Sequence, residues 1–415
     1  MSVSSKNRIK SVKAREIIDS RGNPTLEVAL TTGAGIFCAS VPSGASRGAN
    51  EAVELRDGDN SRFGGKGVLK ACFNVNEVIN QQIVGMDCRE LEAIDKKLQE
   101  IDQTKNFSRL GANAAVGVSL ACARAAAGAL NQPLWRYFAG LAKTKNVALP
   151  KPCFNVINGG AHAGSNLDVQ EFMIVPFAEK FSDNLRFACE IYHQLKIDLA
   201  EKFGKLSINL GDEGGFAPPV NSPKEALDCL NHTLASVQPL AAPKFILDVA
   251  SSQFYNSGKY NMHLGSFDSR QLADFYTQLL SQFTAIIGLE DPFAEDDWAG
   301  WQNFKFSGMI IGDDLLTTNT ARIAQANEKK ACNAMIVKIN QIGTVSQAIE
   351  AVKLAQAYSW KIIVSHRSGE TNDDFIADFA VGIGADFIKS GAPARGERLA
   401  KYNRLLKIED ELANG

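Results

Sequence analysis

AMIVKINQIGTVSQAIEAVKLAQAYSWKIIVSH, residues 334–366, contains the clearest structural pattern of this chain. Two short apolar runs, AMIV and KIIVS, flank a segment in which apolar residues recur at every third or fourth position. This alternation predicts a strand, a helix and a second strand. The first run closes on Lys338 and the second on His366.

Similar runs occur on both sides of this unit. They are FMIVP after Glu171, KFILD at 244–248, AIIGLED at 285–291, GMIIGD at 308–313 and DFIKS at 386–390. The polar end points from Asp248 to Lys389 lie 42, 23, 25, 28 and 23 residues apart. Spacings of this size suit repeated strand–helix units, which form either a closed barrel or an open doubly wound sheet.

The first 142 residues have a different pattern. Segments 25–32 and 35–41 read as strands between Gly and Pro residues, and 68–84 and 91–101 have helical periodicity. Strands followed by helices predict a small α+β domain at residues 1–142, which leaves residues 143–415 as a second, α/β domain. The Ala- and Gly-rich stretch 111–130 contains Arg124, so we expect an interior helix rather than a membrane span.

Composition and charge exclude several classes of protein. The chain has 415 residues, of which 45% are hydrophobic, so a large core is expected and general disorder is not. A net charge of -2 argues against nucleic acid as a partner. The eight cysteines form no CxxC pair and are expected to be reduced core residues. The polar, basic N-terminus has no signal-peptide pattern, so the expected location is the cytoplasm.

The polar end points predict a site if the sheet closes into a barrel, because the C-terminal ends of barrel strands meet at one mouth. Three of them are the carboxylates Asp248, Glu290 and Asp313, which would repel one another without a cation among them. An all-oxygen cluster suits Mg²⁺ or Mn²⁺ better than zinc. The alternative is that each carboxylate pairs with a lysine or caps a helix.

Two lysines, Lys338 and Lys389, end later strands. Lowering a lysine pKa from ~10.4 to roughly 7–8 takes about 4 kcal/mol, which one unit charge at ~4 Å supplies at an effective dielectric of ~20. A neutral lysine beside a metal is a competent base for a carbon acid. A surface or salt-bridged lysine is the alternative.

Two glycine-rich loops lie outside these late strands. NGGAHAG at 158–164 carries His162, and GDEGGFAP at 211–218 carries Glu213. Glu171 and Glu213 are candidates for a pair in which one carboxyl stays protonated, as a general acid requires. The basic stretch 395–407 predicts a solvated amphipathic helix with an i,i+4 pair between Glu397 and Lys401.

Ten motifs, in order along nearly the whole chain, resemble those of the enolase family. They are DSRGNP (19–24), VPSGAS (41–46), LGANA (110–114), NGGAHAG (158–164), QEFM (170–173), GDEGGFAP (211–218), EDPFAEDDW (290–298), KINQIG (338–343), SHRSGET (365–371) and ERLAKYN (397–403). The resemblance implies a small N-terminal α+β domain followed by a modified eight-stranded TIM-like barrel. It also implies the reversible dehydration of 2-phospho-D-glycerate to phosphoenolpyruvate by a homodimer.

The same resemblance implies roles for individual residues. Lys338 matches the base that removes the C2 proton, and Glu213, with Glu171 beside it, matches the acid that protonates the leaving hydroxyl. The implied substrate-binding residues are His162, Glu171, Lys338, His366, Arg367, Ser368 and Lys389. The implied ligands of two Mg²⁺ ions are Asp248, Glu290, Asp313 and, for the second ion, Ser46. Two dications offset the charge of the dianion that forms when the proton leaves.

Two other functions compete with this interpretation. One is a superfamily member that acts on a non-phosphorylated acid, which the match at His162, Arg367 and Ser368 argues against. The other is a catalytically weak paralogue with a structural or surface plasminogen-binding role, which would add a surface or secreted pool. Loss of Lys338, Glu213 or a metal carboxylate would have indicated it, and all are present.

The chain departs from the family pattern at a few positions near the site. Arg47 stands where the family loop has Thr, and Gln253 replaces an acid. Ser390 and Gly396 replace Thr and Ser. We hypothesise that Arg47 alters closure of its loop over the substrate or adds a phosphate contact. Unchanged kinetics in Arg47→Thr would count against this.

Overall fold

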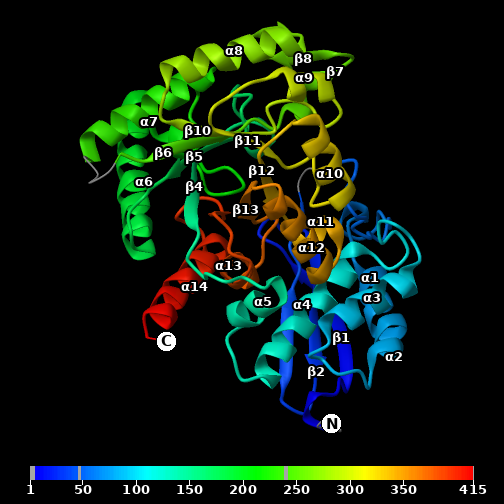
Figure 1. Ribbon diagram of the computed structural model, residues 1–415. Helices are drawn as coiled ribbons and strands as arrows, with labels where there is room; N and C mark the ends of the chain where they lie inside the picture. Colours follow the sequence, from blue (N-terminus) through cyan, green and yellow to red (C-terminus); the bar gives the residue numbers. More distant parts are fainter. Residues whose placement is uncertain (1–4, 45–47, 238–241, 415) are drawn as a thin grey trace.

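The computed structural model describes residues 5–44, 48–237 and 242–414. Its N-terminal part is a three-stranded antiparallel sheet in the order β1-β2-β3, packed against helices (Figure 1). The elements are β1 (Ser11–Ile18), β2 (Pro24–Thr31), β3 (Ile36–Ser40), α1 (Leu69–Phe73), α2 (Asn80–Ile83), α3 (Leu91–Asp102), α4 (Ala112–Ala129) and α5 (Leu134–Ala142). The predicted strands and helices are therefore present, with a π-helical turn at Asn74–Ile79 between α1 and α2.

Helix α4 is the centre of this part. Almost all of its residues are buried, and it packs on β2 and β3, as its Ala- and Gly-rich sequence predicted. Small side chains permit this approach: a Cβ at Gly117 would lie 2.7 Å from Val28. In the described part of the chain no single helix is long and apolar enough to cross a membrane, although α4 and α5 pass that test together as a pair bent by 104°.

The remaining chain forms the closed barrel, which settles the choice between barrel and open sheet. Its strands, in order around the barrel, are β10 (Ile286–Glu290), β11 (Met309–Gly312), β12 (Ala334–Val337), β13 (Lys361–Ser365), β14 (Phe387–Lys389), β4 (Lys151–Asn158), β5 (Glu171–Val175) and β6 (Lys244–Asp248). Strand β5 runs antiparallel to both β4 and β6, and the other neighbouring pairs are parallel. The predicted modified eight-stranded barrel is confirmed.

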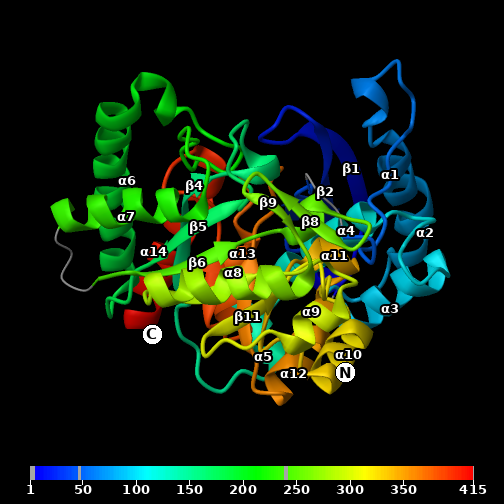
Figure 2. The ribbon, with the colours of Figure 1, turned by 90° about the horizontal axis from the view of Figure 1, so that it is seen from above.

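Helices surround the barrel, as Figure 2 shows from above for α6, α7 and α8. They are α6 (Phe181–Phe203), α7 (Pro223–Val237), α8 (Ser269–Gln282), α9 (Trp298–Asn303), α10 (Thr320–Lys329), α11 (Ile339–Ile342), α12 (Val345–Ala357), α13 (Phe375–Gly382) and α14 (Gly396–Ala413). A small sheet, β7 (Tyr255–Asn256), β8 (Lys259–Met262) and β9 (Gly265–Phe267), precedes α8.

The interior of the barrel is a separate apolar cluster. It contains Cys153, Met173, Val175, Ile246, Ile311, Ala334, Ile336, Ile363 and Phe387. Side chains two residues apart on a strand share a face. Asp248, Asp313 and Lys338 each follow such a core residue by two positions, so the strand period aims them into the barrel mouth.

One expectation about the fold is wrong. The stretch 395–407 is not a solvated helix: on α14 both Arg398 and Lys401 are fully buried. The ammonium group of Lys401 contacts the backbone oxygen of Glu397 at 2.8 Å, rather than its carboxylate. Alternation of charged and apolar residues looks the same for an exposed helix and for one whose cations are buried against polar loops. The domain boundary at residue 142 stays a prediction.

Candidate active site

The predicted strand end points meet at the C-terminal mouth of the barrel. Asp248, Glu290 and Lys389 are the last residues of their strands, and Asp313, Lys338 and His366 follow theirs directly. Glu171 begins β5, which runs in the opposite direction, so its first residue lies at the same rim and pairs in register with Asp248. All of these residues except Glu290 line one cavity.

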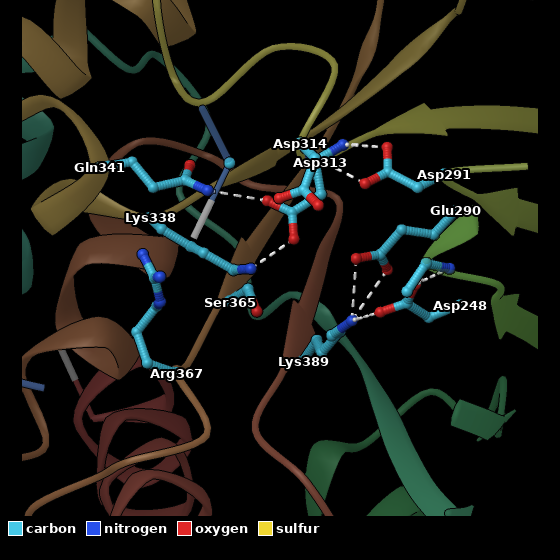
Figure 3. A network of polar contacts seen from close by, with 12 residues as sticks. Asp248, Glu290, Asp291, Asp313, Asp314, Lys338, Gln341, Ser365, Arg367 and Lys389 are labelled. Atoms are coloured by element: carbon cyan, nitrogen blue, oxygen red, sulfur yellow. Dashed lines mark hydrogen bonds and ion pairs between the residues drawn. The ribbon is translucent and has the colours of Figure 1, made fainter. Parts of the chain in front are cut away.

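Lys389 is the centre of the first charge cluster (Figure 3). Its Nζ lies 2.9 Å from Asp248 Oδ2 and 2.9 Å from both oxygens of Glu290, with Glu171 Oε2 at 3.2 Å. Burial alone would lower the pKa of Lys389, but the surrounding carboxylates outweigh it and hold the pKa well above its ordinary value. A buried ammonium thus already links two of the three predicted metal carboxylates.

The third carboxylate belongs to a neighbouring cluster. Asp313 accepts a hydrogen bond from Lys338 Nζ and another from Gln341 Nε2 at 2.9 Å (Figure 3). Burial would raise the pKa of Asp313, but Lys338 and Lys389 outweigh it and lower the pKa. The same pairing raises the pKa of Lys338 even though burial opposes it. This direction is opposite to the one expected for a lysine base beside a metal.

A second group of carboxylates at the mouth has a structural explanation. Oxygens of Asp291, Asp313 and Asp314 lie within 4.8 Å of one another. The Asp291 carboxylate, however, accepts the backbone N–H groups of Asp313 and Asp314 at 2.9 and 2.8 Å. Asp291 therefore fixes the turn after β11, which places Asp313 at the mouth.

Glu171, Glu213 and His162 form the other side of the site. Their ligand atoms also lie within 4.8 Å of one another. Burial, and next the charge of Glu213, raise the pKa of Glu171 well above its ordinary value. Burial opposes ionisation of Glu213 too, but His366, His162 and Arg398 lower its pKa well below the usual range. Glu171 is thus disposed to hold a proton and Glu213 to be ionised, as expected for a pair that shares one proton. The resemblance gives the acid role to Glu213, so the direction for that residue is opposite to the one expected.

The two carboxyls reach the mouth from different elements. Glu171 is on a strand, whereas Glu213 is on the glycine-rich loop before α7. Only glycine fits at Gly211, where a Cβ would lie 2.6 Å from the backbone oxygen of His162, and Gly214 has φ +87°. The backbone oxygen of Glu213 accepts from Ala392 N at 3.0 Å, which ties this loop to the end of β14.

The residues predicted to contact the phosphate also line the cavity. Arg367 Nη1 lies 2.9 Å from Glu51 Oε2, and both side chains are buried. His162 Nε2 lies 3.0 Å from Ser368 Oγ. Ser46 and Arg47 fall outside the described residues. Gln253 is exposed, in the 3-10 turn Ser251–Phe254, and does not line the cavity.

The two domains match two family models. Residues 9–138 match "Enolase, N-terminal domain" and residues 146–415 match "Enolase, C-terminal TIM barrel domain". The chain is 51% identical over 424 residues to Enolase B of Dictyostelium discoideum, which covers 97% of this chain and 95% of that protein. It is 48% identical over 421 residues to Enolase 1 of Entamoeba histolytica, and the match covers 98% of this chain and 97% of that protein.

The chain belongs to the enolase family. It is a phosphopyruvate hydratase, a lyase of glycolysis, and the family implies a divalent metal and a small-molecule substrate. The comparisons give no support to a surface-binding paralogue.

Four contributors to this enolase site were not singled out from the sequence. Glu51 pairs with Arg367, Asn155 donates to Glu213 at 3.1 Å, and Gln341 donates to Asp313. Arg398 contacts His366. Gln341 and Arg398 stand inside the recognised motifs KINQIG and ERLAKYN, and Asn155 is a polar residue in an apolar strand. These signals could have identified three of the four, whereas Glu51 has no comparable sequence signal.

Proposed function

We propose that this enolase dehydrates 2-phospho-D-glycerate with Lys338 as the base and the Glu171–Glu213 pair as the acid. The observation that carries the proposal is the convergence of two lysines and four carboxylates from different barrel strands on one buried mouth. Lys338 takes the proton from C2, and the pair returns a proton to the departing hydroxyl at C3. Because the two carboxyls titrate together, the acid role belongs to the pair.

The donor set fits a hard divalent cation. Asp248, Glu290 and Asp313 offer carboxylate oxygens only, which suits Mg²⁺. Burial raises the pKa of Glu290 well above its ordinary value, so positive charge is needed at this position if the group is to be ionised. We propose that these three residues hold one Mg²⁺ and that Ser46 belongs to the site of a second. Bound Mg²⁺ supplies positive charge that stabilises a developing anion and disfavours the ammonium form of a nearby lysine.

The substrate has two anionic ends, and the mouth has a cation for each. Lys389 is assigned to the substrate carboxylate. Arg367 is assigned to the phosphate, because a guanidinium can hold two phosphate oxygens at once. His162, His366 and Ser368 complete the contacts with the substrate. We further propose that the protein is cytoplasmic and forms a homodimer. Sedimentation of the purified protein tests the dimer.

The test is the absorbance of enol product from 2-phosphoglycerate. We expect a rise that needs Mg²⁺, disappears with chelator and disappears in Lys338→Ala. A flat trace from folded, metal-loaded protein would contradict the proposed reaction. A rise that survives in Lys338→Ala would contradict the assignment of the base alone.

A further inference from the structure

Helix α14 places two fully buried cations, Arg398 and Lys401, against the active-site loops. Lys401 Nζ donates to Glu370 Oε2 at 2.7 Å and to the backbone oxygen of Thr371 at 2.6 Å. Arg398 lies one turn earlier and reaches the segment that carries His366, Arg367 and Ser368. Neither residue has an assigned part in the reaction.

Arg398 makes four hydrogen bonds from its two terminal nitrogens. Nη1 lies 2.7 Å from His366 Nδ1 and 2.7 Å from the backbone oxygen of Arg367. Nη2 donates to the backbone oxygens of Ser368 at 2.7 Å and Asp212 at 3.1 Å. One guanidinium thus joins the loop after β13 to the glycine-rich loop that carries Glu213.

The chemistry of Arg398 decides the state of His366. A guanidinium has no acceptor and stays protonated in proteins, so in this contact Arg398 must be the donor. Nδ1 of His366 must therefore offer its lone pair. An imidazole that is unprotonated at Nδ1 is neutral and carries its hydrogen on Nε2.

The nitrogen that carries this hydrogen lies close to a carboxyl of the catalytic pair. His366 Nε2 lies 3.3 Å from Glu213 Oε1, and Asn155 Nδ2 donates to Glu213 Oε2 at 3.1 Å. Glu213 Oε2 thus accepts a hydrogen bond from Asn155, and Oε1 lies near His366 Nε2, which is close but not aligned for a hydrogen bond in this structure. Burial, and next the charge of Arg398, keep His366 neutral, since they lower its pKa to about 3 against the opposing effect of Glu213.

We propose that Arg398 is a positioning residue that locks His366 as the neutral Nε2–H tautomer, so that His366 can only donate a hydrogen bond to Glu213. The relay Arg398–His366–Glu213 fixes the orientation of the carboxyl at the barrel mouth. This inference rests on the proposed function for the part that Glu213 plays in the reaction. The tautomer itself is independent of it.

The experiment is ¹⁵N NMR of the histidine side chains in the full-length protein. Only five histidines are present, and His366→Gln assigns the signal in question. In the wild type we expect His366 to be unprotonated at Nδ1, protonated at Nε2 and unchanged from about pH 5.5 to about pH 8.5. A protonated Nδ1, or titration within this range, would overturn the proposal without any variant of Arg398.

Two variants separate positioning from general loop stability. Arg398→Met removes the donor, and we expect mixed tautomers and a higher pKa of His366 than in the wild type. Lys401→Met is the matched control, because Lys401 is equally buried on the same helix but has no contact with His366. Equal changes in both variants, or no change in Arg398→Met, would contradict the relay.

Kinetics supply the second readout. In Arg398→Lys, which keeps the charge but has one donor group for four acceptors, we expect kcat to fall about tenfold or more while KM stays within about threefold. The acidic limb of the kcat profile should also shift. If the wild type does not turn over 2-phosphoglycerate, the proposed function fails while the NMR result still decides the tautomer.

Discussion

The ammonium group of Lys389 lies 2.9 Å from both carboxylate oxygens of Glu290. Both side chains are buried. Because Lys389 ends β14 and Glu290 ends β10, the contact links strands on different sides of the barrel mouth. A buried ion pair is costly to break from one side, because the remaining charge has no partner. The stability of this enolase should therefore depend on the cations at the mouth.

Replacing Lys389 should make folding depend on metal. In Lys389→Ala with chelator, Glu171, Asp248 and Glu290 lose their shared cation, and we expect a loss of about 3–5 kcal/mol in the free energy of unfolding. Saturating Mg²⁺ should recover part of this loss, since binding to the native state stabilises it. Urea denaturation measures the loss of unfolding free energy with chelator and its recovery with Mg²⁺. The control is Lys361→Ala, because Lys361 is exposed and forms an ion pair with Asp386. Identical curves with chelator and with Mg²⁺ would argue against a metal at these carboxylates.

Removing the base should affect chemistry more than binding. We expect Lys338→Ala to lower kcat by roughly 10²–10⁴-fold, the usual contribution of a positioned base. Asp313 loses its lysine partner but keeps its hydrogen bond from Gln341, so Mg²⁺ binding measured by calorimetry should persist. Lys353→Ala is the control, since that lysine bonds to Leu141 O far from the mouth. Near-normal turnover in Lys338→Ala would transfer the base role to another residue.

The pair between Arg367 and Glu51 should separate binding from stability. Arg367→Gln removes charge-assisted hydrogen bonds, each worth about 1.5–3 kcal/mol, so inhibition by inorganic phosphate should weaken roughly 10–100-fold. It also leaves Glu51 buried without Arg367, which lowers stability. The double variant Glu51→Gln/Arg367→Gln should recover stability but not phosphate binding. Recovery of both stability and phosphate binding would mean that Arg367 supports the fold and does not bind phosphate itself.

Asp95 should give the stability a pH dependence. This residue of α3 is fully buried, its Oδ2 accepts from Ser346 N at 2.9 Å, and burial raises its pKa to about 6 from 3.8. Since the folded state prefers the protonated form, stability from this group is greatest below about pH 4 and is lost as the pH rises to about 6. The cost at neutral pH is about 3 kcal/mol.

Asp95→Asn tests this directly. The difference in unfolding free energy between wild type and variant should change by up to about 3 kcal/mol between pH ~4 and pH ~7.5, with the wild type losing more as the pH rises. Glu92→Gln, an exposed acid on the same helix, should show no such change. A constant difference for Asp95→Asn across this range would contradict the raised pKa.

Local patterns in the chain were sufficient for the strand–helix units and for most of the polar residues at their ends, but they left a closed barrel and an open sheet as alternatives. Period-two alternation puts Ile246 and Asp248 on one face of β6, and Ile336 and Lys338 on one face of the strand–loop junction after β12. Parallel strands then bring those polar ends to one rim. The face on which a side chain lies depends on a short segment, and the parallel arrangement depends on the length of the connections. Both can be read from a single sequence.

Tertiary packing determines which charged groups of the site pair with one another. The three predicted metal carboxylates divide between two lysines. Lys389 reaches Asp248 and Glu290 from a strand 141 and 99 residues away along the chain, whereas Lys338 pairs with Asp313 of the neighbouring strand end. Arg398 was expected on a solvated helix, yet it is fully buried and bonds to two active-site loops. A guanidinium is stable there only because four acceptors surround it, and those acceptors come from segments 30 to 186 residues away. No local pattern in α14 encodes them.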